Sequence, residues 1–257
     1  MINIFREYLK YQINAQRRHG VHSPYVYNFG DKCASLKVPD EVEKGFKKIK
    51  NKLLKDKTIL QVQDLGAGSK KLNQQRTIKQ IAKISGSTNK YGKLLYRLVA
   101  HYPVKEVLEL GTSLGLGTYW LSASKKEVKV TTVEGCKHTF NYTKANFPKA
   151  LQPQINFVQS SFIDYLKTLS NRPPFDLIFI DGDHQKESLL GQLHLLEPYI
   201  HDETIIVLDD IRWSKEMLEA WEILVLNQNY HLTLDLFKMG IIIKRHHQQK
   251  EHFVIRY

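Results

Sequence analysis

A glycine-rich turn directly follows the short apolar run of residues 104–110. From Glu109 it reads Glu-Leu-Gly-Thr-Ser-Leu-Gly-Leu-Gly. Glycine permits a tight turn from strand to helix and a close approach of the backbone to a ligand, and the helix N-terminus can face an anionic group. The turn contains neither GxGxxG, because Ser113 and Leu116 replace two of its glycines, nor GxxxxGK[ST]. Glu134 ends the next apolar run, where a carboxylate can accept hydrogen bonds from both hydroxyls of a ribose. Turn and acid together favour a site for a nucleoside cofactor.

Carboxylates also end two later apolar runs. Asp181-Gly-Asp-His184 follows one run, and Asp209-Asp210 follows the next. If the two runs are neighbouring strands, their ends lie about 4.8 Å apart, and the acids can face one point above the sheet. Carboxylates at such distances repel each other unless a proton or a cation lies between them, and oxygen ligands alone suit Mg²⁺ or Ca²⁺ rather than zinc. The alternative is that an Asp such as Asp210 caps the following helix.

Other candidates carry weaker signals. A second glycine segment, residues 64–69 (DLGAGS), lacks a strand–helix–strand pattern with a terminal acid, and we interpret it as a tight loop. Trp213 follows the second acidic pair and either walls a pocket or packs at a helix start. His19 and His22 either lie over the pocket, if the N-terminal part is a cap, or make structural hydrogen bonds. His246, His247 and His252 are interpreted as the solvated residues of a polar tail.

The spacing of apolar residues predicts the elements that position these groups. Helical spacing is found in 1–18, 40–57, 76–85 and 91–101. From residue 104 onward, strand-like and helix-like runs alternate in five units, and two closing strands are joined so tightly that they must form an antiparallel hairpin. These seven strands are 104–110, 128–134, 155–159, 175–181, 204–210, 231–237 and 240–245. The pattern predicts an α/β fold with a doubly wound, mainly parallel seven-stranded sheet and a ligand at the carboxyl ends of its strands.

Length and composition limit the class of protein. The 257 residues are 42% hydrophobic and 25% charged, which excludes a disordered or low-complexity chain. The two cysteines, Cys33 and Cys136, have no zinc-ligand or disulfide-framework spacing, so we expect a reducing compartment. The apolar runs are far shorter than the roughly 20 residues of a membrane helix, and the charged N-terminus is unlike a signal peptide. We expect a cytoplasmic protein that does not enter a membrane.

The motifs in order resemble a known family. ELGTSLGLGTYWL, VTTVEG, FDLIFIDGDH and IIVLDDI resemble class I S-adenosylmethionine-dependent methyltransferases, and within them the metal-dependent O-methyltransferases of the catechol O-methyltransferase type. The resemblance covers about residues 85–245. It implies the Rossmann-like methyltransferase fold over 85–257, with 1–84 as a helical N-terminal extension or cap.

The resemblance also assigns roles to individual residues. S-adenosylmethionine would contact the first loop, the acid after the second strand, the segment after the third strand and the first Asp of the fourth, namely Glu109, Gly111, Thr112, Ser113, Gly115, Glu134, Ser160, Ser161 and Asp181. Mg²⁺ or another divalent cation would be held by Asp181, Asp209 and Asp210. His184, with Asp181, falls on the catalytic positions, where the family's animal enzymes place a lysine base; those enzymes have Asn at the position of Asp210.

The activity implied is O-methylation of a small-molecule hydroxyl, with divalent-metal assistance. The net charge of +12 allows an acidic acceptor. One alternative is an RNA or other nucleic-acid methyltransferase, supported by that charge and by the lysine-rich helix 40–57. Another is a regulatory protein that binds the cofactor without catalysis. A nicotinamide dehydrogenase is disfavoured because GxGxxG is absent. The oligomeric state is not indicated.

Overall fold

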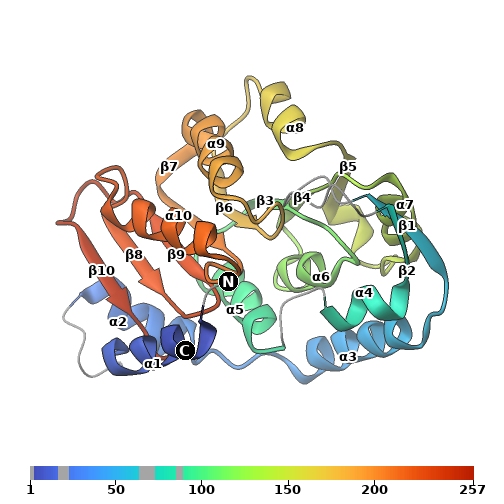
Figure 1. Ribbon diagram of the computed structural model, residues 1–257, viewed down its shortest axis with the longest axis horizontal. Coiled ribbons are helices and arrows are strands. Elements are labelled where there is room, and N and C mark those ends of the chain that lie inside the picture. The colour runs from blue at the N-terminus through green and yellow to red at the C-terminus, as the bar shows by residue number, and fades with distance from the viewer. Residues whose placement is uncertain (1–2, 17–22, 64–72, 85–88) are drawn as a thin grey trace. The chain divides into compact units, whose positions relative to one another are not determined.

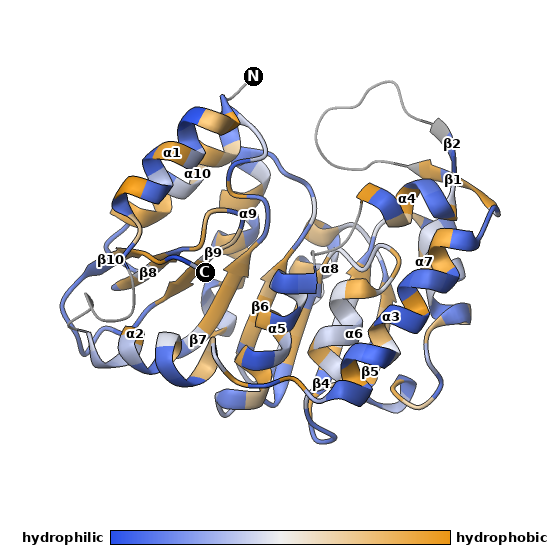
Figure 2. Ribbon diagram, turned by 90° about the horizontal axis from the view of Figure 1, so that it is seen from below, coloured by the Kyte–Doolittle hydropathy of each residue, from blue (hydrophilic) through white to orange (hydrophobic). Residues whose placement is uncertain are grey.

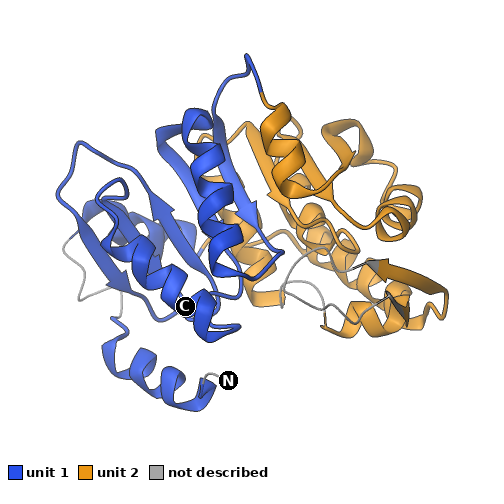
Figure 3. Ribbon diagram, turned by 45° about the horizontal axis from the view of Figure 1, so that its top comes forward, with its two compact units in different colours: residues 1–35, 170–257 blue, residues 36–169 orange. Residues whose placement is uncertain are grey.

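The computed structural model describes residues 3–16, 23–63, 73–84 and 89–257. These residues form two compact units, one of residues 1–35 and 170–257 and the other of residues 36–169 (Figure 3). The predicted N-terminal extension is therefore divided, with its first 35 residues in one unit and the rest in the other. The units are groups of mutual contacts, so the predicted domain boundary at residue 84 stays a prediction.

The unit of residues 36–169 contains three parallel strands in the order β3–β4–β5. They are β3 (Glu106–Leu110), β4 (Lys129–Glu134) and β5 (Ile155–Gln159). A separate antiparallel pair consists of β1 (Ile59–Gln63) and β2 (Asn73–Thr77). The helices are α3 (Asp40–Lys55), α4 (Ile78–Ile84), α5 (Asn89–His101), α6 (Leu116–Ser122), α7 (Lys137–Asn146) and α8 (Phe162–Thr168).

The other unit contains five strands in the order β10–β8–β9–β7–β6. They are β6 (Phe175–Ile180), β7 (Ile200–Leu208), β8 (Leu232–Asp235), β9 (Gly240–Ile243) and β10 (Glu251–Val254). Figure 1 shows β10, β8 and β9 side by side. The β6–β7 and β8–β10 pairs are parallel, whereas β9 is antiparallel to both neighbours. The helices are α1 (Ile4–Asn14), α2 (Pro24–Asn28), α9 (Lys186–Leu196) and α10 (Lys215–Leu226).

The strands β6 and β7 are built on runs of β-branched and other apolar residues. Leu177, Ile178 and Phe179 in β6 have no exposed surface, and β7 ends in the buried run Ile205–Leu208. Strands buried on both faces are typical of parallel sheets covered by helices. Figure 2 shows β6 and β7 as hydrophobic, while the helices carry hydrophilic residues. The prediction of an α/β fold with a mainly parallel sheet is confirmed.

The number of strands is a correction. The main sheet has eight strands rather than seven, because β10 adds to β8 as a parallel neighbour. The sequence predicts a solvated tail here, but His252 lies in the strand, with Nδ1 2.7 Å from Thr233 Oγ1. The predicted hairpin is confirmed, with Asp235 opposite Gly240.

The N-terminal helix is shorter than its apolar pattern predicts, and it buries a different residue. The pattern covers 1–18, whereas α1 begins at Ile4, after its cap Asn3, and ends at Asn14. Phe5 and Ile13, two members of the apolar stripe, are 68% and 82% exposed, and the buried residue of α1 is Tyr11. In the described part of the chain no helix is both long and apolar enough to cross a bilayer. His19, His22 and the segment DLGAGS lie outside the described residues.

Candidate functional site

The glycine-rich turn after β3 has the strained backbone that its sequence requires. Gly111 and Gly115 have φ angles of +112° and +76°, and Ser113 between them has a φ of +46°. A Cβ at Gly115 would lie 3.0 Å from Phe147, so this position tolerates a side chain poorly in space as well as in backbone angle. The amides of Gly111 and Thr112 both donate to the carbonyl of Val133, at 3.0 and 3.2 Å, which fixes the turn to β4.

Glu134 joins the same turn from the end of β4. Its Oε2 accepts a hydrogen bond from the Ser113 amide at 2.9 Å, and its Oε1 accepts one from the Cys136 amide at 2.8 Å. Thr143 in α7 donates to the Ser113 carbonyl at 2.6 Å. The structure thus brings the predicted Ser113 and Glu134 together.

Glu109 lies in the interior of the unit of residues 36–169. It has no exposed surface, and its Oε2 accepts hydrogen bonds from the hydroxyls of Thr118 and Thr132. Burial raises the pKa of Glu109 to about 7; the two threonine bonds oppose that rise, and the charge of Glu134 adds to it. Within the described residues, Oε1 has no hydrogen-bond partner. Thr112, 2% exposed, pairs with Thr132 at 2.6 Å. Direct contacts of Glu109 and Thr112 with a cofactor stay predictions.

The two serines after β5 have structural partners. Ser161 caps α8, since its Oγ accepts from the Asp164 amide at 3.1 Å and donates to the Asp164 carboxylate at 2.6 Å. The Ser160 amide donates to the Glu134 carbonyl at 3.1 Å, so this serine, which follows β5, lies beside the end of β4. Ser160 is therefore placed beside Glu134, while the Ser161 hydroxyl is already used in the cap. Their predicted contacts with the adenine stay predictions.

The second group of predicted residues lies in the unit of residues 1–35 and 170–257. Ile180 pairs with Leu208 in the β6–β7 register, and the Asp209 amide donates to the Ile180 carbonyl at 2.9 Å. The two strands are thus neighbours, as the argument for adjacent acids required. Asp209 is 2% exposed, and burial, followed by the charges of Asp181 and Asp210, raises its pKa well above the usual value.

A lysine that no sequence motif indicates, Lys238, lies among these acids. Lys238 Nζ is 3.2 Å from Asp209 Oδ2 and 3.5 Å from Asp210 Oδ1. Burial acts to lower the pKa of Lys238, but the charges of Asp209, Asp210 and Asp181 outweigh burial and raise that pKa. Lys238 lies in the tight turn between β8 and β9. Its positive charge at that turn is the one feature of the sequence that could have indicated a place near the acids.

His184 and Trp213 border the acids. His184 Nε2 is 4.0 Å from Asp210 Oδ2, and its ring centroid is 5.9 Å from that of Trp213. Trp213 is 64% exposed, so it is available to an aromatic or flat ligand rather than packed in the core. The ring of Tyr8 in α1 meets Phe237 at 5.1 Å, edge to face, next to Lys238. This group thus combines acids, one base, one ammonium and aromatic rings.

The three acids do not fit a divalent cation in the arrangement that the structure gives them. Among the described residues, no group of three or more His, Cys, Asp or Glu side chains could hold a metal ion. The position between Asp209 and Asp210 is already filled by the Lys238 ammonium. The metal role of Asp181, Asp209 and Asp210 stays a prediction, which this arrangement does not support.

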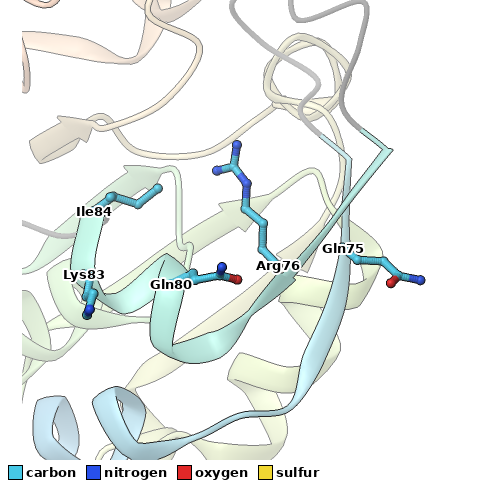
Figure 4. Close-up of a pocket in the computed structure, with 5 residues that line it drawn as sticks. All are labelled: Gln75, Arg76, Gln80, Lys83 and Ile84. Atoms are coloured by element: carbon cyan, nitrogen blue, oxygen red, sulfur yellow. The ribbon is translucent and has the colours of Figure 1, made fainter.

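A pocket of about 330 Å³ lies elsewhere, over β2 and α4. Figure 4 shows Arg76 extending from β2 toward α4, whereas Gln75 points away. None of the predicted site residues lines this pocket, whose lining is Gln75, Arg76, Gln80, Lys83 and Ile84. Residues 64–72 and 85–88, which adjoin these elements in the chain, lie outside the described residues. We assign this pocket no ligand.

Comparisons with known proteins agree with the resemblance. Residues 108–211 match a family model described as a methyltransferase domain. A catechol O-methyltransferase of Mycobacterium tuberculosis is 30% identical over 122 residues, which cover 47% of this chain and 54% of that protein. One of Niastella koreensis is 34% identical over 142 residues, 53% of this chain and 62% of that protein. This chain thus spans between half and two thirds of the length of these relatives.

A solved structure gives the fold. The O-methyltransferase from Bacillus cereus in complex with SAH has a TM-score of 0.58 and 17% identity, with 85% of this chain and 96% of that chain covered. The chain thus has the Rossmann-like fold of such methyltransferases. The resemblance stated from the sequence motifs is confirmed.

Proposed function

We propose that this chain is an S-adenosylmethionine-dependent O-methyltransferase that acts on a hydroxyl of a small molecule. The observation that carries the proposal is the bond from the Ser113 amide to Glu134 Oε2, which joins the glycine-rich turn to an acid able to take ribose hydroxyls. The match of residues 108–211 to a methyltransferase domain and the two relatives named catechol O-methyltransferase support the same reading.

The cofactor would lie against the turn after β3. Gly111, Ser113 and Gly115 would accommodate its methionine part, because the two glycines have no side chain and let the backbone approach a ligand closely. Glu134 would accept the ribose hydroxyls. Thr112, Glu109 and Ser161 would act mainly by holding the turn and α8, since their side chains are already bonded within the protein. Ser160, which follows β5, would edge the adenine, and the contact of Asp181 with the methyl donor stays a prediction.

Methyl transfer from a sulfonium needs alignment and a nucleophilic oxygen. In the proposed step the acceptor oxygen forms a bond to the methyl carbon, the carbon–sulfur bond breaks, and its electron pair stays on sulfur as S-adenosylhomocysteine (SAH). The hydroxyl proton passes to His184, because a histidine side chain can accept a proton at neutral pH. Alignment alone supplies roughly 7–11 kcal/mol of barrier reduction in well-oriented reactions.

The acceptor is proposed to be small and aromatic. Trp213 offers an exposed ring beside His184, and the acids with Lys238 offer both acceptors and a donor for hydroxyl groups. A hydroxylated aromatic molecule fits this combination, and a negatively charged one is compatible with the net charge of +12. With only two cysteines in the chain, we propose a cytoplasmic location.

Calorimetry and a transfer assay test the proposal. S-adenosylmethionine should bind with one-to-one stoichiometry, and incubation with catechol-type acceptors should produce methylated acceptor and SAH in equal amounts. Binding without transfer to any hydroxylated acceptor would instead favour the cofactor-binding regulatory alternative. Absence of cofactor binding would overturn the proposal.

A nucleic-acid acceptor is the second candidate, on one specific observation. Helix α3 exposes lysines along its length, Lys44, Lys47, Lys48, Lys52 and Lys55. A salt-dependent gel shift with RNA, together with methyl transfer to that RNA, would favour this candidate over a small molecule.

A further inference from the structure

The acids beside His184 are arranged around Lys238. Its Nζ lies 3.2 Å from Asp209 Oδ2 and 3.5 Å from Asp210 Oδ1. Asp209 is 2% exposed, and within the described residues its Oδ1 accepts no hydrogen bond. A buried carboxylate oxygen without a donor is costly, so this group is incomplete without a ligand that donates a proton or a hydrogen bond.

We propose that Lys238 is the resident cation of the acceptor site, in the place of the divalent metal that the resemblance implies. A lysine ammonium has three N–H donors, and two carboxylates contact this one, so it has a donor to offer to an acceptor oxygen. The acceptor hydroxyl would in turn face the unpartnered oxygen of Asp209. This inference rests on the proposed function for the nature of the acceptor.

The backbone fixes Lys238 in this position. Its amide donates to the Leu236 carbonyl at 3.0 Å, closing a three-residue turn in which Phe237 has a φ of +72°. A bulky residue with such an angle is strained and keeps it only where the surroundings enforce it. The Lys238 carbonyl also accepts a hydrogen bond from the Ile211 amide at 3.1 Å. The backbone that bears the Lys238 side chain thus has few alternative conformations.

A buried ion pair enforces that turn. Arg212 donates to both oxygens of Asp235, at 2.9 and 2.6 Å, and to the Phe237 carbonyl at 2.8 Å. Asp235 also accepts from the Phe237 amide at 2.8 Å. The side chains of Arg212 and Asp235 are only 9% and 5% exposed, and a bidentate pair of this kind has a defined geometry. Lys238 therefore differs from a surface lysine, whose ammonium moves freely.

A divalent ion and this ammonium compete for the same oxygens. Mg²⁺ lies at about 2.0–2.1 Å from its ligands and Ca²⁺ at about 2.3–2.6 Å, so either ion on Asp209 and Asp210 would come against Lys238 Nζ. Two positive charges at that distance repel each other. A metal can enter only when the ammonium has left, and the lysine therefore excludes it.

The acceptor chemistry then proceeds without a metal. Lys238 donates a hydrogen bond to the acceptor oxygen and stabilises the negative charge that develops there as its proton passes to His184. The oxygen forms its bond to the methyl carbon, and the sulfonium sulfur takes the electron pair of the broken bond. An ammonium aimed at the developing charge is worth about 10²–10³ in rate in comparable sites.

Two variants and a control test the inference by metal binding, which needs no turnover. Lys238→Met keeps a side chain of similar length but removes its charge, whereas Lys238→Arg keeps the charge. The control, Lys215→Met, changes a lysine whose side chain is 83% exposed. Each is titrated with Mn²⁺, followed by calorimetry and electron paramagnetic resonance. We expect one bound Mn²⁺ for Lys238→Met and none for the wild type, Lys238→Arg or Lys215→Met.

Activity gives an independent reading. EDTA should leave the turnover of the wild type unchanged. The Lys238→Met variant should have a kcat about 10²-fold lower than the wild type, with the same affinity for the cofactor. Stoichiometric Mn²⁺ on the wild type, or turnover lost in EDTA and restored by Mg²⁺, would overturn the inference. So would a folded Lys238→Met protein that binds no Mn²⁺. If neither the wild type nor any variant transfers a methyl group, but Mn²⁺ binds as expected, the proposed function is wrong and the assignment of Lys238 as the resident cation still holds.

Discussion

The amide nitrogen of Ser113 lies 2.9 Å from Glu134 Oε2, so the acid that ends β4 holds the turn that follows β3. The other oxygen of Glu134 holds the Cys136 amide in the same way. Two backbone donors thus hold the carboxylate in a defined orientation. A preorganised acceptor of this kind binds hydroxyl donors at little entropic cost.

Replacement of Glu134 tests this arrangement directly. Glu134→Gln should weaken S-adenosylmethionine binding by about 10- to 100-fold, since hydrogen bonds to a charged group contribute about 1.5–3 kcal/mol. Calorimetry gives the affinity, and Glu127→Gln, the same change at an exposed position, is the matched control. Equal affinities of the two variants would show that Glu134 does not contact the cofactor.

The buried Glu109 predicts a pH dependence of stability. Burial raises its pKa to about 7 in the folded protein, from the usual 4.5. The folded state then binds more protons than the unfolded state between these values, so stability is full below about pH 4.5 and falls as the pH rises to about 7. The loss amounts to about 3 kcal/mol, since one pKa unit corresponds to about 1.4 kcal/mol.

The isosteric variant Glu109→Gln isolates this effect. It cannot ionise, so its free energy of unfolding should gain about 2–3 kcal/mol relative to the wild type between about pH 5 and about pH 8. Urea unfolding at the two pH values provides the comparison, and the other titrating groups cancel in the difference. A constant difference between the two proteins would contradict the raised pKa.

The ion pair beneath the Lys238 turn predicts a large loss of stability. Arg212→Met leaves Asp235, 3% exposed, without its partner, and breaking a buried pair in this way costs about 3–5 kcal/mol. The double variant Arg212→Met, Asp235→Leu removes the stranded charge and should recover part of the loss. Denaturant unfolding measures both, with exposed Arg6→Met as control. A loss below about 1 kcal/mol would show that the pair does not hold the turn.

His184 is predicted to act on the acceptor alone. His184→Gln should lower kcat by about 10²–10⁴, the range for loss of a general base, and should leave the affinity for S-adenosylmethionine within about twofold. The control is His194→Gln, an exposed histidine of α9. Unchanged kcat, or an equal fall in the control, would remove His184 from the proton transfer.

The sequence by itself determined the elements and the local chemistry. The parallel strands, the closing hairpin and the turn at Gly111–Gly115 follow from apolar runs and glycine positions, because these depend on neighbours in the chain. The same reasoning missed β10, whose partner β8 is some 20 residues earlier and whose pairing only the folded sheet reveals.

Only the tertiary structure decided the partners of the charged groups. The sequence predicts that Asp209 and Asp210 follow a strand and that a proton or a cation must offset their repulsion. The fold supplied Lys238 from a hairpin 28 or more residues later, held by Phe237 and Arg212. It also buried Glu109, which the resemblance implies to contact the cofactor. Charge pairing and burial depend on distances across the sheet, and sequence spacing does not encode those distances.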